Sequence, residues 1–325
     1  MTRRLAWFAV ALVLLTAVLG RGAPAQDYPV RPITIVVPFP PGGGVDVLAR
    51  VVGERLATAM KAQVIVDNRG GAGGTLGTRS VAKAEPDGHT LLLGHTGTMS
   101  INPTLYANPG YDPRKDFAPI GLIASMQVAL IAHPSFPPRT VAEFIAYAKK
   151  ESGKVNIGTS AIGTGSYLCA ELFKSMAGLN VTLVPYRGTA ALMNDLLGGH
   201  VPIAFGVLPP ALGNLQAGKL RAIAVSGAKR FSQLPEVPTV AESGLPGFEA
   251  VLHYGLLAPA GTPKPIIARL NKELRAAVDS DEVKKRIHAE GGDPLASSPE
   301  EYAADIDREE RKWAALIKKL NLKVQ

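Results

Sequence analysis

Glycines and hydroxyl residues gather at three points of the chain where a short apolar run ends. Residues 33–39 lead into Pro40-Pro41-Gly42-Gly43-Gly44, residues 91–94 into His95-Thr96-Gly97-Thr98, and residues 155–158 into the segment 159–166. Apolar residues at helical spacing follow the first and third loops, so each is predicted to open an amphipathic helix. The free N–H groups of a helix start, at the positive end of its dipole, bind a carboxylate or phosphate without a charged side chain. The loops therefore predict anion binding rather than catalysis.

The sequence lacks the motifs typical of nucleotide-binding, serine-nucleophile and zinc sites. No G-x-G-x-x-G lies between a strand and a helix, no glycine loop ends in Gly-Lys-Ser/Thr, and no serine stands in G-x-S-x-G. The six histidines form no H-E-x-x-H and no i, i+4 pair. The single cysteine, Cys169, falls inside a predicted helix, where core packing explains it. We expect no catalytic residue, no metal and no cofactor; an exported hydrolase using the same loops is an alternative that needs a nucleophile–base pair.

The elements that position these loops alternate between strand and helix. Further strands are predicted at 64–66, 182–185, 202–205 and 220–225, which favours parallel α/β sheets. A long extended apolar segment at 117–134 is predicted to cross between two such units. Start signals at Ser280 and at Ser298-Pro299-Glu300-Glu301 predict C-terminal helices that pack back on the first unit.

The N-terminus resembles an export signal. Arg3 and Arg4 precede an apolar run from Leu5 to Leu19, and Ala23-Pro24-Ala25 fits a cleavage site before Gln26. This run is short for a membrane span of roughly 20 residues, so a retained anchor is the weaker alternative. Removing residues 1–25 lowers the formal charge from +8 to +5, because three arginines and no acid are lost. The dispersed basic residues and 6% aromatic content predict no nucleic-acid interface, whereas a mild positive field attracts small anions.

Eight segments together resemble the tripartite tricarboxylate transporter substrate-binding family, also called the Bug (Bordetella uptake gene) receptors. They are residues 28–33, 37–46, 66–74, 87–92, 111–119, 184–188, 234–239 and 257–263. The resemblance implies an α/β periplasmic binding protein type II fold, with two α/β domains joined by two crossover segments around a ligand cleft. On this basis we expect a signal peptide at 1–25, one domain from 26–125 plus 228–325, and another from 126–227.

The family implies a monomeric periplasmic receptor that closes on a small carboxylate and delivers it to the permease subunits of a tripartite tricarboxylate transporter. A binding protein that signals to a sensor kinase stays an alternative. Carried over by position, the ligand-binding residues are Phe39, Gly42, Gly43, Gly44, Asp46, His95 and Thr96 in the first domain, and Ser160, Ala161, Gly163, Thr164, Gly165, Ser166, Tyr186, Phe205 and Leu208 in the second.

Several of these residues also have simpler explanations. The glycines at 42–44 are compatible with a tight turn alone, and Thr164 and Ser166 with helix caps. Asp46 suits either a ligand ammonium group or the helix dipole, and Tyr186 suits the core as well as the cleft. Tyr167 and His253 stand where relatives often have histidine and tryptophan, so the identity of the ligand stays open.

Overall fold

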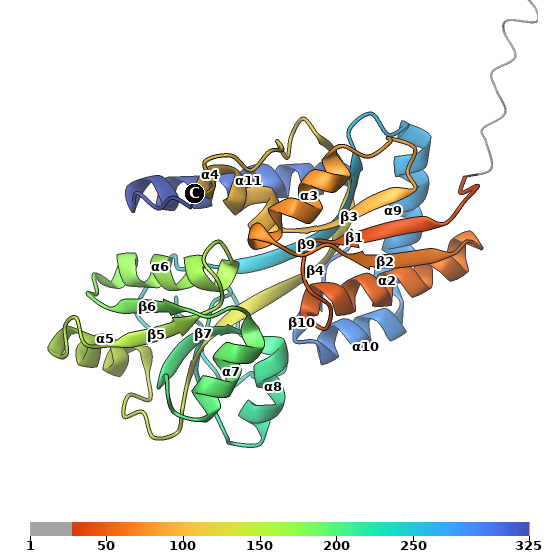
Figure 1. The fold of residues 1–325 in the computed structure, drawn as a ribbon. Coiled ribbons are helices and arrows are strands. Elements are labelled where there is room, and N and C mark those ends of the chain that lie inside the picture. Colours follow the sequence, from red (N-terminus) through yellow and green to blue (C-terminus); the bar gives the residue numbers. More distant parts are fainter. Residues whose placement is uncertain (1–27, 325) are drawn as a thin grey trace, which may run out of the picture.

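The computed structural model describes residues 28–324, so the predicted signal peptide lies outside the described residues. These residues form two lobes that lie side by side, each a sheet covered by helices (Figure 1). Within the described range, no helix is both long and apolar enough to cross a membrane.

The first lobe is built on three parallel strands; the apolar residues of the two inner strands are buried, whereas Ile65 on the edge strand is exposed. They are β1 (Ile33–Val37), β2 (Val64–Asn68) and β3 (Thr90–His95), in the order β2-β1-β3. The helices of this lobe are α2 (Gly44–Met60), α3 (Thr75–Ala82), α4 (Asn102–Leu105), α9 (Lys264–Asp279), α10 (Asp281–Ala289) and α11 (Pro299–Lys319). A 3₁₀ turn, η1 (Ala72–Gly74), precedes α3, and a π-helical turn, η2 (Gly97–Ile101), follows β3.

The second lobe repeats this pattern with shorter strands. Its strands are β5 (Asn156–Thr159), β6 (Thr182–Pro185), β7 (Ile203–Val207) and β8 (Arg221–Val225), and its helices are α5 (Val141–Lys150), α6 (Gly165–Ala177), α7 (Thr189–Leu197) and α8 (Leu208–Gln216). Strand β5 runs parallel to both β6 and β7. Cys169 is buried in α6, as predicted.

Two long strands connect the lobes. Strand β4 (Phe117–Ala132) pairs along residues 117–127 with β9 (Val251–Pro259), and along residues 128–132 with β7 and β8. The predicted crossing at 117–134 is therefore confirmed. The predicted parallel pairing occurs within each lobe, whereas the crossover strands β4 and β9 run antiparallel to their neighbours as the chain crosses between the lobes and returns.

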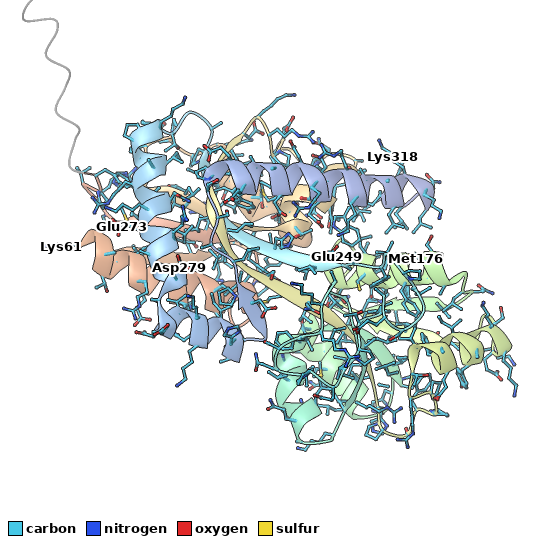
Figure 2. The ribbon with its side chains drawn as sticks, turned by 180° about the vertical axis from the view of Figure 1, so that it is seen from behind. Lys61, Met176, Glu249, Glu273, Asp279 and Lys318 are labelled. Carbon is cyan, nitrogen blue, oxygen red and sulfur yellow. The ribbon has the colours of Figure 1, made fainter. Side chains whose placement is uncertain are left out.

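The C-terminal helices begin where the sequence predicts. Ser280 caps α10, and Ser298 with Glu301 forms a capping box at the start of α11. Helix α11 then runs along the first lobe until its end lies beside α6 of the second (Figure 1). Seen from behind, Lys318 near the end of α11 and Met176 near the end of α6 lie on the same side of the molecule (Figure 2). A short strand, β10 (Gly292–Pro294), adds to β4.

Candidate functional site

The loop between β1 and α2 leaves the first turn of α2 open. Gly43 is the N-cap of the helix and offers no side chain to its amides, and Gly42 has a φ of +85°. A Cβ placed on Gly42 or Gly43 would meet no atom within 4 Å. The N–H groups of the first turn have no partner inside the helix, so the positive end of the α2 dipole faces this open space.

The Asp46 side chain stabilises this loop through several hydrogen bonds. Its carboxylate accepts hydrogen bonds from the Gly42 amide (3.0 Å), from Arg50 (3.0 and 3.1 Å) and from Asn68 (3.0 Å). Burial alone would raise the pKa of Asp46, but the bonds from Arg50, Gly42 and Asn68 outweigh it and hold that pKa below its usual value. The side chain is therefore a structural acceptor in this arrangement, and a contact with a ligand ammonium group stays a prediction.

His95, at the end of β3, lies among aromatic rings next to this loop. Its ring centroid is 4.8 Å from that of Phe39 and 5.8 Å from that of Tyr254. Burial lowers the pKa of His95 to about 4, so the imidazole is neutral at pH 7. Because Nδ1 accepts the Gly97 amide at 2.7 Å, the hydrogen-bond pattern assigns the ring proton to Nε2. The hydroxyl of the next residue, Thr96, accepts the backbone N–H of His253 at 2.8 Å.

In the loop between β5 and α6, two hydroxyls are already engaged. Thr164 is the N-cap of α6, and its side chain accepts the Tyr167 amide. The Ser166 hydroxyl accepts the Ser160 amide at 3.1 Å and donates to the Phe205 carbonyl at 2.7 Å. These bonds shape the loop around the helix start, and direct contact of either hydroxyl with a ligand stays a prediction.

The two helix starts reach the same pair of strand residues. Met126 of β4 and Leu252 of β9 are direct partners in the antiparallel ladder. A Cβ on Gly44, the first residue of α2, would lie 3.7 Å from the Met126 side chain, and a Cβ on Gly165, the first residue of α6, would overlap the Leu252 side chain. Helices from different lobes therefore begin beside the same pair of residues on the crossover strands.

The remaining predicted residues are less open. Tyr186 donates its hydroxyl to Asp195 at 2.8 Å, and burial, followed by this hydrogen bond and the charge of Asp195, raises the pKa of Tyr186. The side chains of Phe205 and Leu208 are fully buried. Tyr186 follows β6, Phe205 lies on β7 and Leu208 begins α8. The backbone carbonyl of Phe205 accepts the Ser166 hydroxyl at the α6 start.

Sequence reasoning overlooked Asn102, the first residue of α4. It is fully buried; its amide nitrogen donates to the Gly73 carbonyl at 2.9 Å, whereas its Oδ1 has no hydrogen-bond partner among the described residues. A Cβ on Gly163, whose φ is +87°, would lie 3.4 Å from that oxygen. Asn102 thus lies where the second-lobe loop meets the first lobe. The Asn-Pro pair soon after the His95 loop was the available signal.

No metal-binding cluster of side chains occurs in the part of the chain that the structure describes.

Comparison with known proteins gives concordant matches. Residues 48–322 match the family described as "Tripartite tricarboxylate transporter family receptor". Protein BugT of Bordetella pertussis is 33% identical over 326 residues, covering 100% of this chain and 99% of BugT.

Three solved structures share the fold along nearly their whole lengths. R. palustris Rpa4515 with adipate has a TM-score of 0.85 at 36% identity and covers 91% of this chain and 99% of its own. The periplasmic binding protein BugD gives 0.83 at 40% identity, covering 92% and 100%. MatC from Rhodopseudomonas palustris, with bound malate, gives 0.81 at 35% identity, covering 89% and 100%. The predicted fold class is confirmed.

Proposed function

Because this chain belongs to the tripartite tricarboxylate transporter receptor family, we propose that it captures a small carboxylate between its two lobes. The observation that carries the proposal is the convergence of the α2 and α6 N-termini on the paired residues Met126 and Leu252. Each helix start holds one carboxylate through main-chain N–H groups and its dipole. The ligand is therefore a dicarboxylate, or an acid with a second anionic or strongly accepting group.

Charge and hydrogen bonding at the first loop support this ligand class. The Asp46 carboxylate is neutralised by Arg50, so it presents little net negative charge to an incoming acid. The neutral His95 ring, protonated on Nε2, contributes a hydrogen-bond donor. Adipate and malate, the acids in the Rpa4515 and MatC structures, belong to the same chemical class.

We propose that all the residues predicted above contact or shape this site. The first-lobe glycines and Ser160, Ala161, Gly163 and Gly165 act mainly through the backbone, His95 through its ring, and Asp46, Thr164 and Ser166 mainly by fixing the loops. The domain boundaries we propose are 26–125 plus 228–325 and 126–227, with β4 and β9 as the connections. Ligand binding shifts the population toward the closed arrangement of the lobes.

The output we propose is transport. The chain is exported with cleavage near Ala25/Gln26, acts as a monomer and delivers its ligand to the permease subunits. It binds without turnover, which predicts that ligand incubated with the protein is recovered chemically unchanged.

Calorimetric titration of the mature protein tests the proposal. Adipate, malate and other small carboxylates are titrated, with 1,6-hexanediol as an uncharged control of adipate length. We expect saturable binding of at least one carboxylate and none of the diol. A ligand at about 100 times its Kd stabilises the folded state by roughly 2.7 kcal/mol, so differential scanning fluorimetry gives an independent readout. Absence of carboxylate binding across a broad panel would refute the proposal.

A further inference from the structure

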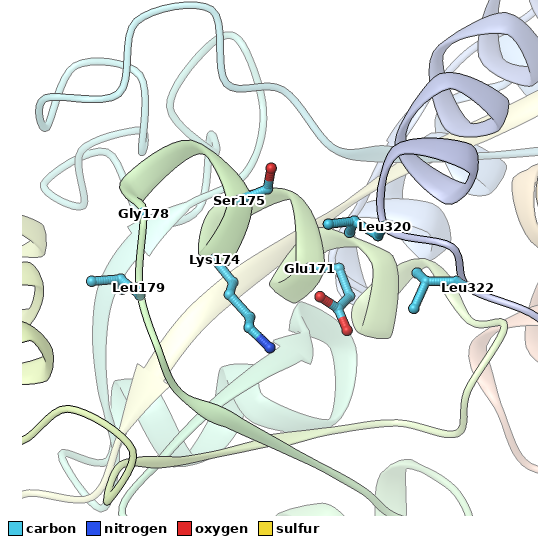
Figure 3. A pocket seen from close by; sticks show the side chains of 7 residues that line it. All are labelled: Glu171, Lys174, Ser175, Gly178, Leu179, Leu320 and Leu322. Carbon is cyan, nitrogen blue, oxygen red and sulfur yellow. The ribbon is translucent and has the colours of Figure 1, made fainter.

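A cavity lies away from the two helix starts, between the end of α6 and the segment that follows α11. Its volume is about 380 Å³, within the range typical of small-molecule pockets. It is lined by Glu171, Lys174, Ser175, Gly178, Leu179, Leu320 and Leu322 (Figure 3). One wall comes from the second lobe and the other from the C-terminal segment.

Glu171 is the unusual group in this cavity. The residue is only 7% exposed, yet its carboxylate makes no ion pair with any lysine, arginine or histidine of the described chain. Its one hydrogen bond comes from the Tyr167 hydroxyl, at 3.0 Å from Oε1. A buried carboxylate is costly unless it is paired with a cation. Lys174 lines the same cavity but makes no ion pair with Glu171; its long side chain can keep its charged end in water.

The rest of the lining is largely aliphatic. Leu320 and Leu322 extend toward α6 from the C-terminal segment, facing the side on which Glu171 lies (Figure 3). Leu179 contributes a further apolar surface beyond the end of α6. The cavity therefore combines one buried negative charge with walls suited to a short hydrocarbon chain.

We propose that this cavity is a binding site for a small organic cation, a primary ammonium group on a short aliphatic chain. The ammonium donates to the Glu171 carboxylate, and the hydrocarbon chain packs against Leu320 and Leu322. A charge-assisted hydrogen bond of this kind is about twice as strong as a neutral one. The amine binds here whether or not a carboxylate lies between the lobes.

A ligand in this cavity affects the arrangement of the lobes, because the cavity lies between them. The C-terminal segment is fixed to the first lobe, because Val324 exchanges backbone hydrogen bonds with Leu105 (2.9 Å) and Ala107 (3.2 Å). It also touches the second lobe, through a bond from Lys319 to Ser175 of 3.1 Å. A cation bound here contacts both sides and favours the present arrangement of the lobes. This coupling rests on the proposed function and on the present arrangement being the one that binds the carboxylate, in which case cation and carboxylate binding reinforce each other.

Titration with n-butylammonium chloride tests the site on the mature protein without any carboxylate. Saturation-transfer NMR at constant ionic strength reports binding, with 1-butanol as the uncharged control. We expect saturable binding of the amine and at least about tenfold weaker binding to the Glu171→Gln variant, which keeps an acceptor for Tyr167 but loses the charge. The matched control is Glu236→Gln, which neutralises an exposed glutamate of the loop after β8 and leaves binding unchanged.

A cavity-filling variant, Leu322→Trp, provides a second check that leaves Glu171 intact, and circular dichroism verifies that each variant folds. We expect it to abolish amine binding. The proposal is overturned if the amine does not bind saturably, if Glu171→Gln binds it as tightly as the unaltered protein, or if butanol binds equally well. Each of these results stands whether or not a carboxylate binds between the lobes, so failure of this proposal is distinguishable from failure of the proposed function.

Discussion

Replacing Gly43 by aspartate places a built-in anion at the start of α2. Gly43 already has the extended backbone of an N-cap, with φ −89° and ψ 167°, and its Cβ direction is empty to 4 Å. The new side chain therefore fits without strain, and its carboxylate accepts the first-turn N–H groups that we assign to the ligand. Gly43→Asp should fold normally and lose carboxylate binding.

The expected magnitude follows from charge. Two carboxylates that contact the same helix turn lie roughly 4 Å apart, which costs about 4 kcal/mol at an effective dielectric constant near 20, or about a thousandfold in Kd. The isosteric Gly43→Asn variant competes for the same N–H groups without this repulsion. It loses only hydrogen bonds to a charged group, about 1.5–3 kcal/mol, or roughly ten- to a hundredfold. The free energy of unfolding of the unliganded protein should change by no more than a few tenths of a kcal/mol for Gly43→Asn, because glycine is itself a tolerated N-cap.

Calorimetry on the three proteins gives the Kd ratios, and urea unfolding gives their stabilities. Gly213→Asp is the matched control, because Gly213 lies on α8 with no atom within 4 Å of its Cβ direction. If Gly43→Asp binds the carboxylate as tightly as the unaltered protein, the α2 start does not hold the ligand. If the aspartate and asparagine variants are equally impaired, the contact is steric rather than electrostatic.

Other substitutions test the loops and their neighbours. His95 has a folded-state pKa of about 4, below its usual 6.5, so the unfolded chain binds the proton more strongly between these values. The free energy of unfolding therefore falls by up to about 3 kcal/mol as the pH drops from about 6.5 to 4. Urea unfolding of His95→Gln should not show this pH-dependent loss. Gly163→Ala should destabilise by about 1 kcal/mol or more because φ is +87°, whereas Gly213→Ala, in an open helical position, should stabilise by about 0.5–1 kcal/mol in the same assay. Ser166→Ala leaves a buried amide and carbonyl unbonded and should cost about 1–3 kcal/mol in thermal or urea unfolding.

Local sequence patterns predicted the elements that carry the site. The glycine loops and the helical spacing that follows them predicted a helix after each loop, and in the structure α2 begins at Gly44 and α6 at Gly165. The crossing segment was also visible, because sixteen residues of β4 are apolar enough to stay extended and buried in both lobes. These features depend on neighbouring residues, so the sequence alone is enough to recognise them.

Strand β9 was not predicted, for a physical reason. Along Val251–Pro259 most side chains are buried on both faces, so the apolar and polar residues do not alternate as they do in a half-exposed strand. The antiparallel partnership of β9 with β3 and β4 depends on residues more than a hundred positions away, which no local pattern contains.

The partners of the site side chains were equally hidden. Ser166 bonds to the Phe205 carbonyl 39 positions away, and Asp46 bonds to Asn68 22 positions away. The sequence does not show whether a hydroxyl or carboxylate in a loop is free or already hydrogen-bonded within the protein. The sequence therefore predicted the loops better than it predicted which of their side chains remain available.

When carboxylates are bound by helix N-termini, ligand selectivity depends on the distance between the two N-termini. Main-chain N–H groups accept any carboxylate, so they carry little information about the rest of the molecule. In this fold the two starts rest against Met126 and Leu252, whose side chains set how closely α2 and α6 approach the crossover strands. The aromatic rings of Phe39, His95 and Tyr254 lie against one another at tilted angles beside the first start and bound the space next to it. Relatives that keep the glycine loops can therefore change ligand by altering a few apolar side chains beneath and beside them, while the fold and the anion-binding geometry stay the same.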